Sequence, residues 1–197
     1  MAISDIMVSP VKVFYGTLGS TLPADSLALA AAWPAGWTHV GYTKTPLSVD
    51  YSYEKLSYEI QESIGIVGGR KTKESLKLET TLAEFTLAGV GQSWGGTVVP
   101  TAAGAGQVGK EEIVGGDVTK LLYQMWGFEG SYEDASQVVR PIRFIIYKGQ
   151  STTGGKLEFG KTDTTGIPLQ IEALEDMTKT ASERMFKWQR VLASATS

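Results

Sequence analysis

The stretch GIVGGRKTKES, residues 65–75, contains the glycines, lysine and hydroxyl expected of a phosphate-binding loop. Such a loop follows the pattern G-x-x-x-x-G-K-[ST], in which backbone N–H groups surround the phosphates and the lysine reaches the terminal ones. Arg70 stands where the second glycine of the pattern is required. The residues that follow alternate, with Leu76 and Leu78 on one side and charged or hydroxyl residues on the other, which is the period of a strand. The stretch therefore predicts the tip of a β-hairpin and no nucleotide site.

A second glycine motif lies in the low-complexity segment GGTVVPTAAGAGQVGKEEIVGG, residues 95–116. Gly104, Gly106 and Gly109 satisfy G-x-G-x-x-G, which binds a dinucleotide when it ends a strand and opens a helix. Gly115 and Gly116 follow before a helix could complete two turns, so the context is wrong. The segment predicts a flexible or surface loop, and no cofactor is expected.

Catalytic and metal-binding groups are sparse. The single histidine, His39, lies between Thr38 and Val40 in a predicted strand, where a packing or surface role is the ordinary one. The chain has no cysteine, and its acidic residues lie scattered among turns and strand faces. The sequence therefore predicts a protein that is not an enzyme and has no catalytic, cofactor or metal site.

The composition is that of a folded β-rich protein. The chain has 197 residues, 23 of them glycine, and a formal net charge of −3. A slight excess of acid argues against an outer surface that holds nucleic acid through its phosphates, but is compatible with a channel that nucleic acid slides past. The N-terminus has no basic region followed by an apolar one, so we expect a soluble protein made in the cytoplasm.

The elements that would position these residues are mainly strands. Residues 37–60 are strand-like, but the apolar positions change from odd (Val49, Tyr51, Tyr53) to even (Leu56, Tyr58), which predicts a bulge or bend near residues 54–55. Residues 71–79 predict the return strand of this long hairpin. One helix is expected over about 81–92, with capping and packing assigned to Thr81, Leu82, Glu84 and Phe85.

The last third returns to strands joined by turn-rich segments. Ile167, Leu169, Ile171 and Ala173 alternate with polar residues, which predicts a strand with one apolar and one polar side. We divide the chain into an N-terminal arm (1–36), a β domain (37–177) with a long hairpin loop at about 61–70 and the glycine-rich loop at 95–116, and a C-terminal segment (178–197). The last of these could form a short helix or a terminal strand.

Two segments resemble a known family. The stretch TTLAEFTL, in which a strand runs into a Leu-Ala-Glu helix, and GIPLQIEALED, with its proline and closing acids, are similar to parts of the tail tube (major tail) proteins of long-tailed bacteriophages. The resemblance runs from about Trp37 to Met177. It implies a β-sandwich or barrel-like domain with one short packed helix, a long hairpin excursion and extended terminal arms.

The resemblance also implies a function. In this family six copies form a ring, and rings stack into a hollow tube through which DNA passes. The implied partners are further copies of the chain, a tape measure protein in the lumen, tail terminator and distal tail proteins, and double-stranded DNA in passage without specific binding. The implied location is the virion tail, with no membrane anchor.

Site residues follow from the resemblance and from the strand pattern. The candidates for contact with a neighbouring subunit or ring lie in the long loop: Gln61, Glu62, Ile64, Ile66, Val67, Arg70, Lys71 and Lys73. The candidates for the lumen wall lie on polar sides of late strands: Glu158, Gln170 and Glu172. Alternation assigns two faces and leaves open which face is inside.

Two other functions fit the same pattern. The chain could form the inner tube of a contractile injection machine. It could also be a β-sandwich that binds carbohydrate or another ligand through one of its five tryptophans, Trp33, Trp37, Trp94, Trp126 or Trp188, although tryptophan in a sandwich is more often buried packing.

Overall fold

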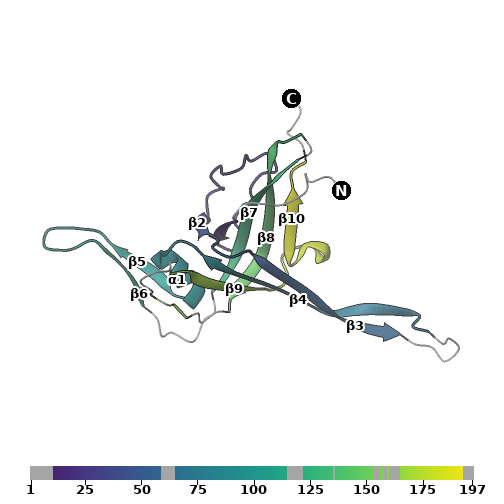
Figure 1. Ribbon diagram of the computed structural model, residues 1–197. Helices are drawn as coiled ribbons and strands as arrows, with labels where there is room; N and C mark the ends of the chain where they lie inside the picture. Colours follow the sequence, from purple (N-terminus) through teal and green to yellow (C-terminus); the bar gives the residue numbers. More distant parts are fainter. Residues whose placement is uncertain are drawn as a thin grey trace.

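The computed structural model describes residues 11–58, 65–114, 122–134, 136–152, 156–157, 159 and 165–192. These residues form ten strands and one α-helix (Figure 1). In chain order the elements are β1 (Lys12–Gly16), β2 (Trp37–Tyr42), β3 (Ser48–Tyr58), β4 (Gly68–Leu82), α1 (Leu87–Trp94), β5 (Thr97–Thr101), β6 (Lys110–Val114), β7 (Tyr123–Glu133), β8 (Val139–Ser151), β9 (Ile167–Ala173), a 3₁₀ turn (Ala181–Glu183) and β10 (Phe186–Arg190).

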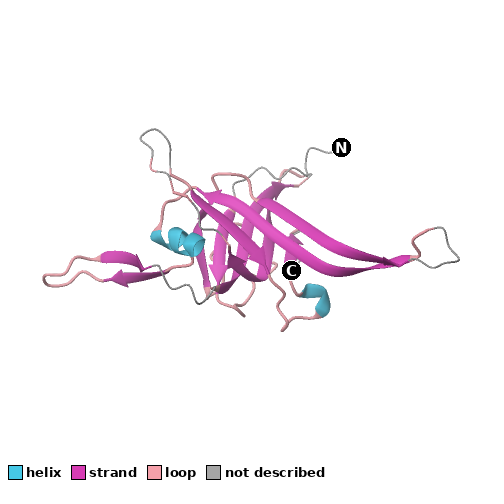
Figure 2. Ribbon diagram, turned by 90° about the horizontal axis from the view of Figure 1, so that it is seen from below, coloured by secondary structure: helices cyan, strands magenta, loops and turns pink. Residues whose placement is uncertain are grey.

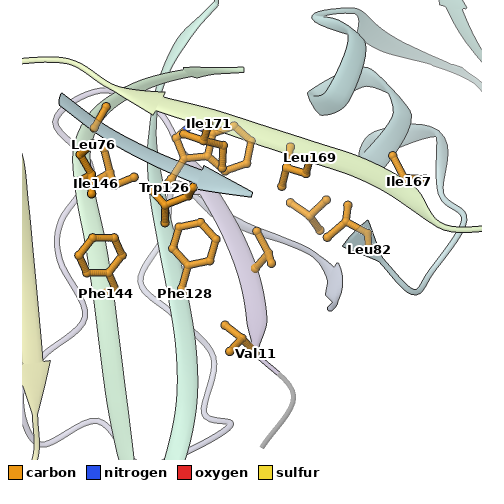
Figure 3. Packing of buried hydrophobic residues seen from close by; sticks show 14 of the residues in the cluster. Val11, Leu76, Leu82, Trp126, Phe128, Phe144, Ile146, Ile167, Leu169 and Ile171 are labelled. Atoms are coloured by element: carbon orange, nitrogen blue, oxygen red, sulfur yellow. The ribbon is translucent and has the colours of Figure 1, made fainter. Parts of the chain in front are cut away.

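The main sheet has the order β2-β1-β7-β8-β9-β4-β3, with β10 also paired to β8. The outer edge of β8 is divided between two partners, because β10 pairs with Ile142–Ile146 and β9 pairs only with Gly149–Ser151. The β9-β4-β3 half therefore leaves the sheet at one end of β8 and folds back over the β1-β7-β8 half (Figure 3). The predicted mainly β class is confirmed, and the sheet is not a closed barrel, since β2 and β3 remain at its edges.

The first core lies between the two halves of the folded sheet. The alternation predicted for β9 is confirmed, since Ile167, Leu169, Ile171 and Ala173 are all buried. Leu76, Leu78 and Leu82 of β4 join them, and they face the side chains of β7 and β8 (Figure 3). Those facing side chains are Trp126, Phe128, Phe144 and Ile146. Each such side chain stabilises the fold by about 1.5–3 kcal/mol through removal from water.

A second core lies on the opposite face of β7 and β8. Met125, Ile145 and Tyr147 pack there against Phe14 and Trp33. The ring of Trp33 stacks on that of Phe14 with centroids 4.2 Å apart. Residues 17–36, which we call the strap, supply Trp33 and cover this face. The central strands β7 and β8 are therefore buried on both sides.

The expectation that residues 1–36 form an arm outside the core is wrong for the described part of that segment. β1 lies inside the sheet between β2 and β7, and Val13 is fully buried. The strap fits because Gly127 leaves room for it: a Cβ on Gly127 would lie 2.3 Å from the Trp33 ring. The wrong prediction came from the mixed composition of the segment, which hides one strand and one anchoring tryptophan.

A buried ion pair fastens the strap to the sheet. The Nε of Arg143 donates to Glu129 at 2.9 Å, and both side chains are fully buried. Arg143 also donates to the carbonyls of Leu27 (2.5 Å) and Ala24 (3.4 Å), while Glu129 accepts from the indole N–H of Trp33 (3.4 Å). Buried charges are tolerated when they are paired and hydrogen-bonded in this way.

The helix begins later than expected. Thr86 caps α1, since its hydroxyl accepts from the Gly89 N–H at 3.0 Å, and Gly95 ends it with φ of 79°. The predicted start at Thr81, with Glu84 closing a capping box, is wrong. Thr81 pairs with Pro168 and Leu82 is fully buried, so β4 continues to Leu82. Burial of that strand end outweighs the local capping signal.

Residues 97–114 form the β5–β6 hairpin and not the loop predicted for residues 95–116. Gly104 and Gln107 exchange two backbone hydrogen bonds of 3.0 Å at its turn, where Gly106 has φ of 75°. The G-x-G-x-x-G motif therefore lies at the end of a hairpin and opens no helix. Of the two possibilities for residues 178–197, the described part contains a strand, β10, preceded by a 3₁₀ turn.

Candidate assembly surfaces

The β3–β4 hairpin extends beyond the body of the protein (Figures 1 and 2). We call residues 50–58 and 65–75 the distal hairpin. All of its β3 residues are exposed, and those of its β4 part are exposed or half-buried. The burial of β4 begins only at Leu76. One hairpin thus has a root in the core and a distal part whose side chains are largely exposed, apart from the contact of Tyr51 with Phe186 of β10.

The predicted irregularity at residues 54–55 is confirmed. Glu54 pairs with Lys73 and Lys55 pairs with Lys71, so the register shifts between them. Thr72 is the extra residue, and its hydroxyl donates to the carbonyl of Glu54 at 3.3 Å. A bulge of this kind bends the strand and changes which residues of the two strands share a face.

The bulge places Lys71 on the same face as Tyr51 and Tyr53. Its ammonium donates to the Tyr51 hydroxyl (3.0 Å) and to Glu74 (2.9 Å), and lies 4.8 Å from the centre of the Tyr53 ring. The hydrogen bond to Tyr51, and next the one to Glu74, raise the pKa of Lys71 above its ordinary value. The lysine therefore stays charged at any pH at which the protein is handled.

Apolar side chains lie on both faces of the distal hairpin. On β3, Leu56 and Tyr58 alternate away from Tyr53 and are 53% and 46% exposed. Ile66 and Val67 are 59% and 56% exposed. Hydrophobic residues scattered singly over a surface are ordinary, but this group is contiguous along one projecting element and is typical of a contact surface.

The predicted long-loop residues divide into two sets. Ile66, Val67, Arg70, Lys71 and Lys73 are exposed on the distal hairpin, which brings them together. Lys73 also lies 3.7 Å from Glu54 across the strands, so the basic side of β4 is partly balanced. Gln61, Glu62 and Ile64 lie outside the described residues.

A second surface is the outward face of the β9-β4-β3 half. Gln170 and Glu172 are half-buried there, between the buried residues of β9. Gln170 donates to Glu79 of β4, and Gln150 donates to Glu172 at 3.2 Å. A shallow groove of about 400 Å³ on this face is lined by Thr45, Pro46, Ser48, Glu79, Thr80, Thr81, Pro168, Leu169 and Gln170. Glu158, the third lumen candidate, lies outside the described residues.

The residues that could serve catalysis or ligand binding lie apart. The His39 ring packs against Phe14 and Tyr42, at 5.1 and 5.5 Å between centroids, and burial lowers its pKa. A search of the described residues finds no group of three acids or histidines placed to hold a metal. No helix in the same ranges is long and apolar enough to cross a membrane.

The tryptophans do not form a ligand platform in the described structure. Trp33 and Trp126 are buried, and the Trp37 indole donates to the carbonyl of Thr21 at 2.8 Å. Trp94 and Trp188 are 52% and 51% exposed but lie on α1 and β10 respectively. The groove on the outward face has no aromatic residue in its lining.

The fold and these surfaces favour a structural protein that works by association. Its exposed apolar groups lie on a projecting hairpin, and its buried polar groups hold the fold together. The family described as phage tail tube protein matches residues 5–190, and the chain belongs to this family. No curated protein matches the chain.

Membership confirms the resemblance drawn from TTLAEFTL and GIPLQIEALED. A phage tail tube protein is a structural component of the virion tail and self-assembles into a tube together with other tail proteins. The family is not known for enzymatic activity.

Proposed function

We propose that six copies of this protein form a ring and that the rings stack into a hollow tube through which double-stranded DNA passes during ejection. Membership of the tail tube family supports the tube. The observation that carries the proposal further is the distal hairpin, whose strands are long, paired and rooted in the core. Within one copy its side chains stay largely exposed, apart from the contact of Tyr51 with Phe186 of β10. A neighbouring copy, in the same ring or the next, supplies the missing surface.

Sheet edges support the same arrangement. β2 and β3 lie at the two ends of the main sheet, and among the described residues neither has a second strand beside it, although Tyr42 of β2 accepts a backbone hydrogen bond from Ala83. Open edges of this kind invite pairing with other chains, and closure into a ring removes them. A contact between two different surfaces of identical copies also propagates, which is how rings stack into a filament.

The outward face of the β9-β4-β3 half is the one we assign to the lumen. The opposite half cannot present its sheet, because the strap covers it through Trp33 and Phe14. The uncovered face is polar, and by register Asp50, Glu79 and Glu172 lie near Lys77. An excess of acid repels phosphate, so DNA slides along the wall and is not retained.

The other partners follow from the tube. A tape measure protein occupies the lumen before DNA does, and tail terminator and distal tail proteins close the two ends. None of these contacts requires a cofactor or a catalytic group. Of the lumen candidates, Gln170 and Glu172 lie on the assigned face.

Negative-stain electron microscopy of the purified protein over a range of concentrations tests the proposal. We expect hollow filaments with a regular axial repeat and sixfold end views. A protein that stays monomeric at every concentration, even when isolated tail tips are added as seeds, would contradict it. Rings of another order would overturn the number six and leave the tube.

A further inference from the structure

The β5–β6 hairpin is a second projecting element that the family resemblance did not assign. It forms a separate two-stranded sheet and extends from the side of the body opposite to the distal hairpin (Figures 1 and 2). An isolated two-stranded hairpin is only marginally stable in water. The body supports this hairpin at one end, and most of its residues remain exposed along its length.

The base of this hairpin is held by α1. Gly96 donates to the carbonyl of Gly91 at 2.8 Å, and a Cβ on Gly91 would lie 2.8 Å from the carbonyl oxygen of Gly96, so the strand begins in close contact with the helix. The helix is tied to the sheet, since the Ser93 hydroxyl donates to the carbonyl of Pro168 at 2.5 Å. The hairpin therefore has a defined direction relative to the body.

The outer face of the hairpin carries two exposed valines among polar residues. Val98 and Ile113 pair across the strands and are half-buried toward the body. Val99 and Val114 alternate away from them and are 52% and 79% exposed. On the same face Lys110 pairs with Glu112 at 2.6 Å, whereas Glu111 lies opposite Pro100 on the other face, with Val98 and Ile113.

The two projecting hairpins complement each other. β4 carries Arg70, Lys71 and Lys73 within four residues, whereas β6 carries adjacent Glu111 and Glu112. Each hairpin combines these charges with exposed aliphatic side chains. Because the hairpins extend in opposite directions, two copies in the same orientation can bring the distal hairpin of one to the β5–β6 hairpin of the next. Such a head-to-tail contact either closes a ring or continues as a filament.

We propose that the β5–β6 hairpin is the receptor for the distal hairpin of a neighbouring copy, with Val99 and Val114 against its aliphatic residues and Glu112 beside its basic strand. This proposal rests on the proposed function, because it names the surface that the distal hairpin contacts within the tube.

Disulfide cross-linking tests the contact cleanly, since the chain has no cysteine of its own. Two single variants, Val99→Cys and Leu56→Cys, are purified separately, mixed, concentrated until tubes form and oxidised. We expect a cross-linked dimer containing one of each variant, enriched at least about tenfold over the control because the contact raises the effective concentration of the two thiols. The control mixes Leu56→Cys with Leu18→Cys, whose side chain has a similar exposure of 49%.

A charge exchange provides a second readout. We expect Glu112→Lys and Arg70→Glu each to raise the protein concentration needed for tube formation, and the double variant to return toward the wild-type value. Tubes from the cysteine variants with no mixed dimer above the control would overturn the receptor proposal and leave the proposed function intact. A wild-type protein that forms no tube would overturn the proposed function and this inference with it.

Discussion

The two halves of β4 differ in burial. From Leu76 to Leu82 the strand alternates regularly, and its even-numbered side chains enter the first core. From Gly69 to Glu74 every residue is exposed, although the strand remains paired with β3 throughout. The same strand therefore serves the fold at one end and is available to a partner at the other.

This difference in burial shows the limit of a prediction from alternation. Period two assigns residues to two faces of a strand, but whether a face is covered depends on what else packs there. Leu76 and Leu56 are both leucines within this hairpin, yet one is 1% exposed and the other 53%. Substitutions in the body should act on unfolding, and those in the distal hairpin on association.

The largest change in the free energy of unfolding is expected at the buried ion pair between Glu129 and Arg143. Arg143→Met should lower the free energy of unfolding by about 3–5 kcal/mol, because Glu129 is left as an unpaired buried charge and the strap loses its anchor. Urea unfolding followed by circular dichroism measures the loss. The double variant Glu129→Leu/Arg143→Met should recover part of it, since no lone charge remains. A loss below about 1 kcal/mol in the single variant would contradict this role.

A matched pair of leucines tests the comparison within the hairpin itself. Leu78→Ala should cost about 2–5 kcal/mol of unfolding free energy, because Leu78 is 1% exposed and a cavity would remain. Leu56→Ala should change the same quantity by no more than about 0.5 kcal/mol. Equal losses at both positions, measured by the same urea unfolding, would show that the distal hairpin packs against its own body.

A deletion at the bulge should change the free energy of unfolding less than the core substitution Leu78→Ala does. Deletion of Thr72 should remove the bulge and straighten the hairpin, which turns the faces of its distal part relative to the body, while Lys71 stays opposite Lys55. We expect a smaller change in unfolding than for Leu78→Ala, a changed near-ultraviolet tyrosine signal and reduced tube formation. Lys71→Met is the control, because it removes the ammonium and keeps the register. Normal tubes from the deletion variant would show that the facing of the distal hairpin is unimportant for assembly.

The smallest effect is a pH dependence at the β7–β8 turn. The hydrogen bond from Arg140 at 2.6 Å, and next the backbone N–H of Val138, hold the pKa of Asp134 below its ordinary value. A carboxyl whose pKa is lowered by folding stabilises the protein above its unfolded pKa of about 3.9, and this contribution is lost as the pH falls through the folded pKa. Asp134→Asn should therefore weaken the acid dependence of the melting temperature below about pH 4. A steeper dependence in the variant would contradict the assignment.

Much of the hairpin and the core could be predicted from the sequence. The change from odd to even apolar positions at residues 54–55 coincides with the bulge, but the inserted residue is Thr72 of β4, and the apolar residues of β3 lie on both faces. The regular alternation of Ile167 through Ala173 predicts β9 and its buried side, because both are local properties of one strand.

Other features depend on contacts between distant residues. Thr81 and Glu84 have capping spacing, but Leu82 is buried by Ile167 and its neighbours, so the strand continues and Thr86 caps the helix. Residues 97–101 and 110–114 form strands that the surrounding glycines obscure, although TVV and EIV have β-branched residues typical of strands.

The buried ion pair was missed for a similar reason. Glu129 and Arg143 lie 14 residues apart and are placed opposite each other by the pairing of β7 with β8. The one local signal is their position between buried aromatic and aliphatic residues in strands that are covered on both faces. The covering strap could not be foreseen, because its anchor is a single tryptophan.

Electron microscopy of the wild-type protein beside the variant Leu56→Ser/Tyr58→Ser tests whether the distal hairpin serves assembly. We expect this variant to unfold at the same urea concentration as the wild type but to form no hollow filaments under conditions in which the wild type forms them. Filaments of normal yield and repeat from the variant would contradict the claim that the distal hairpin serves assembly.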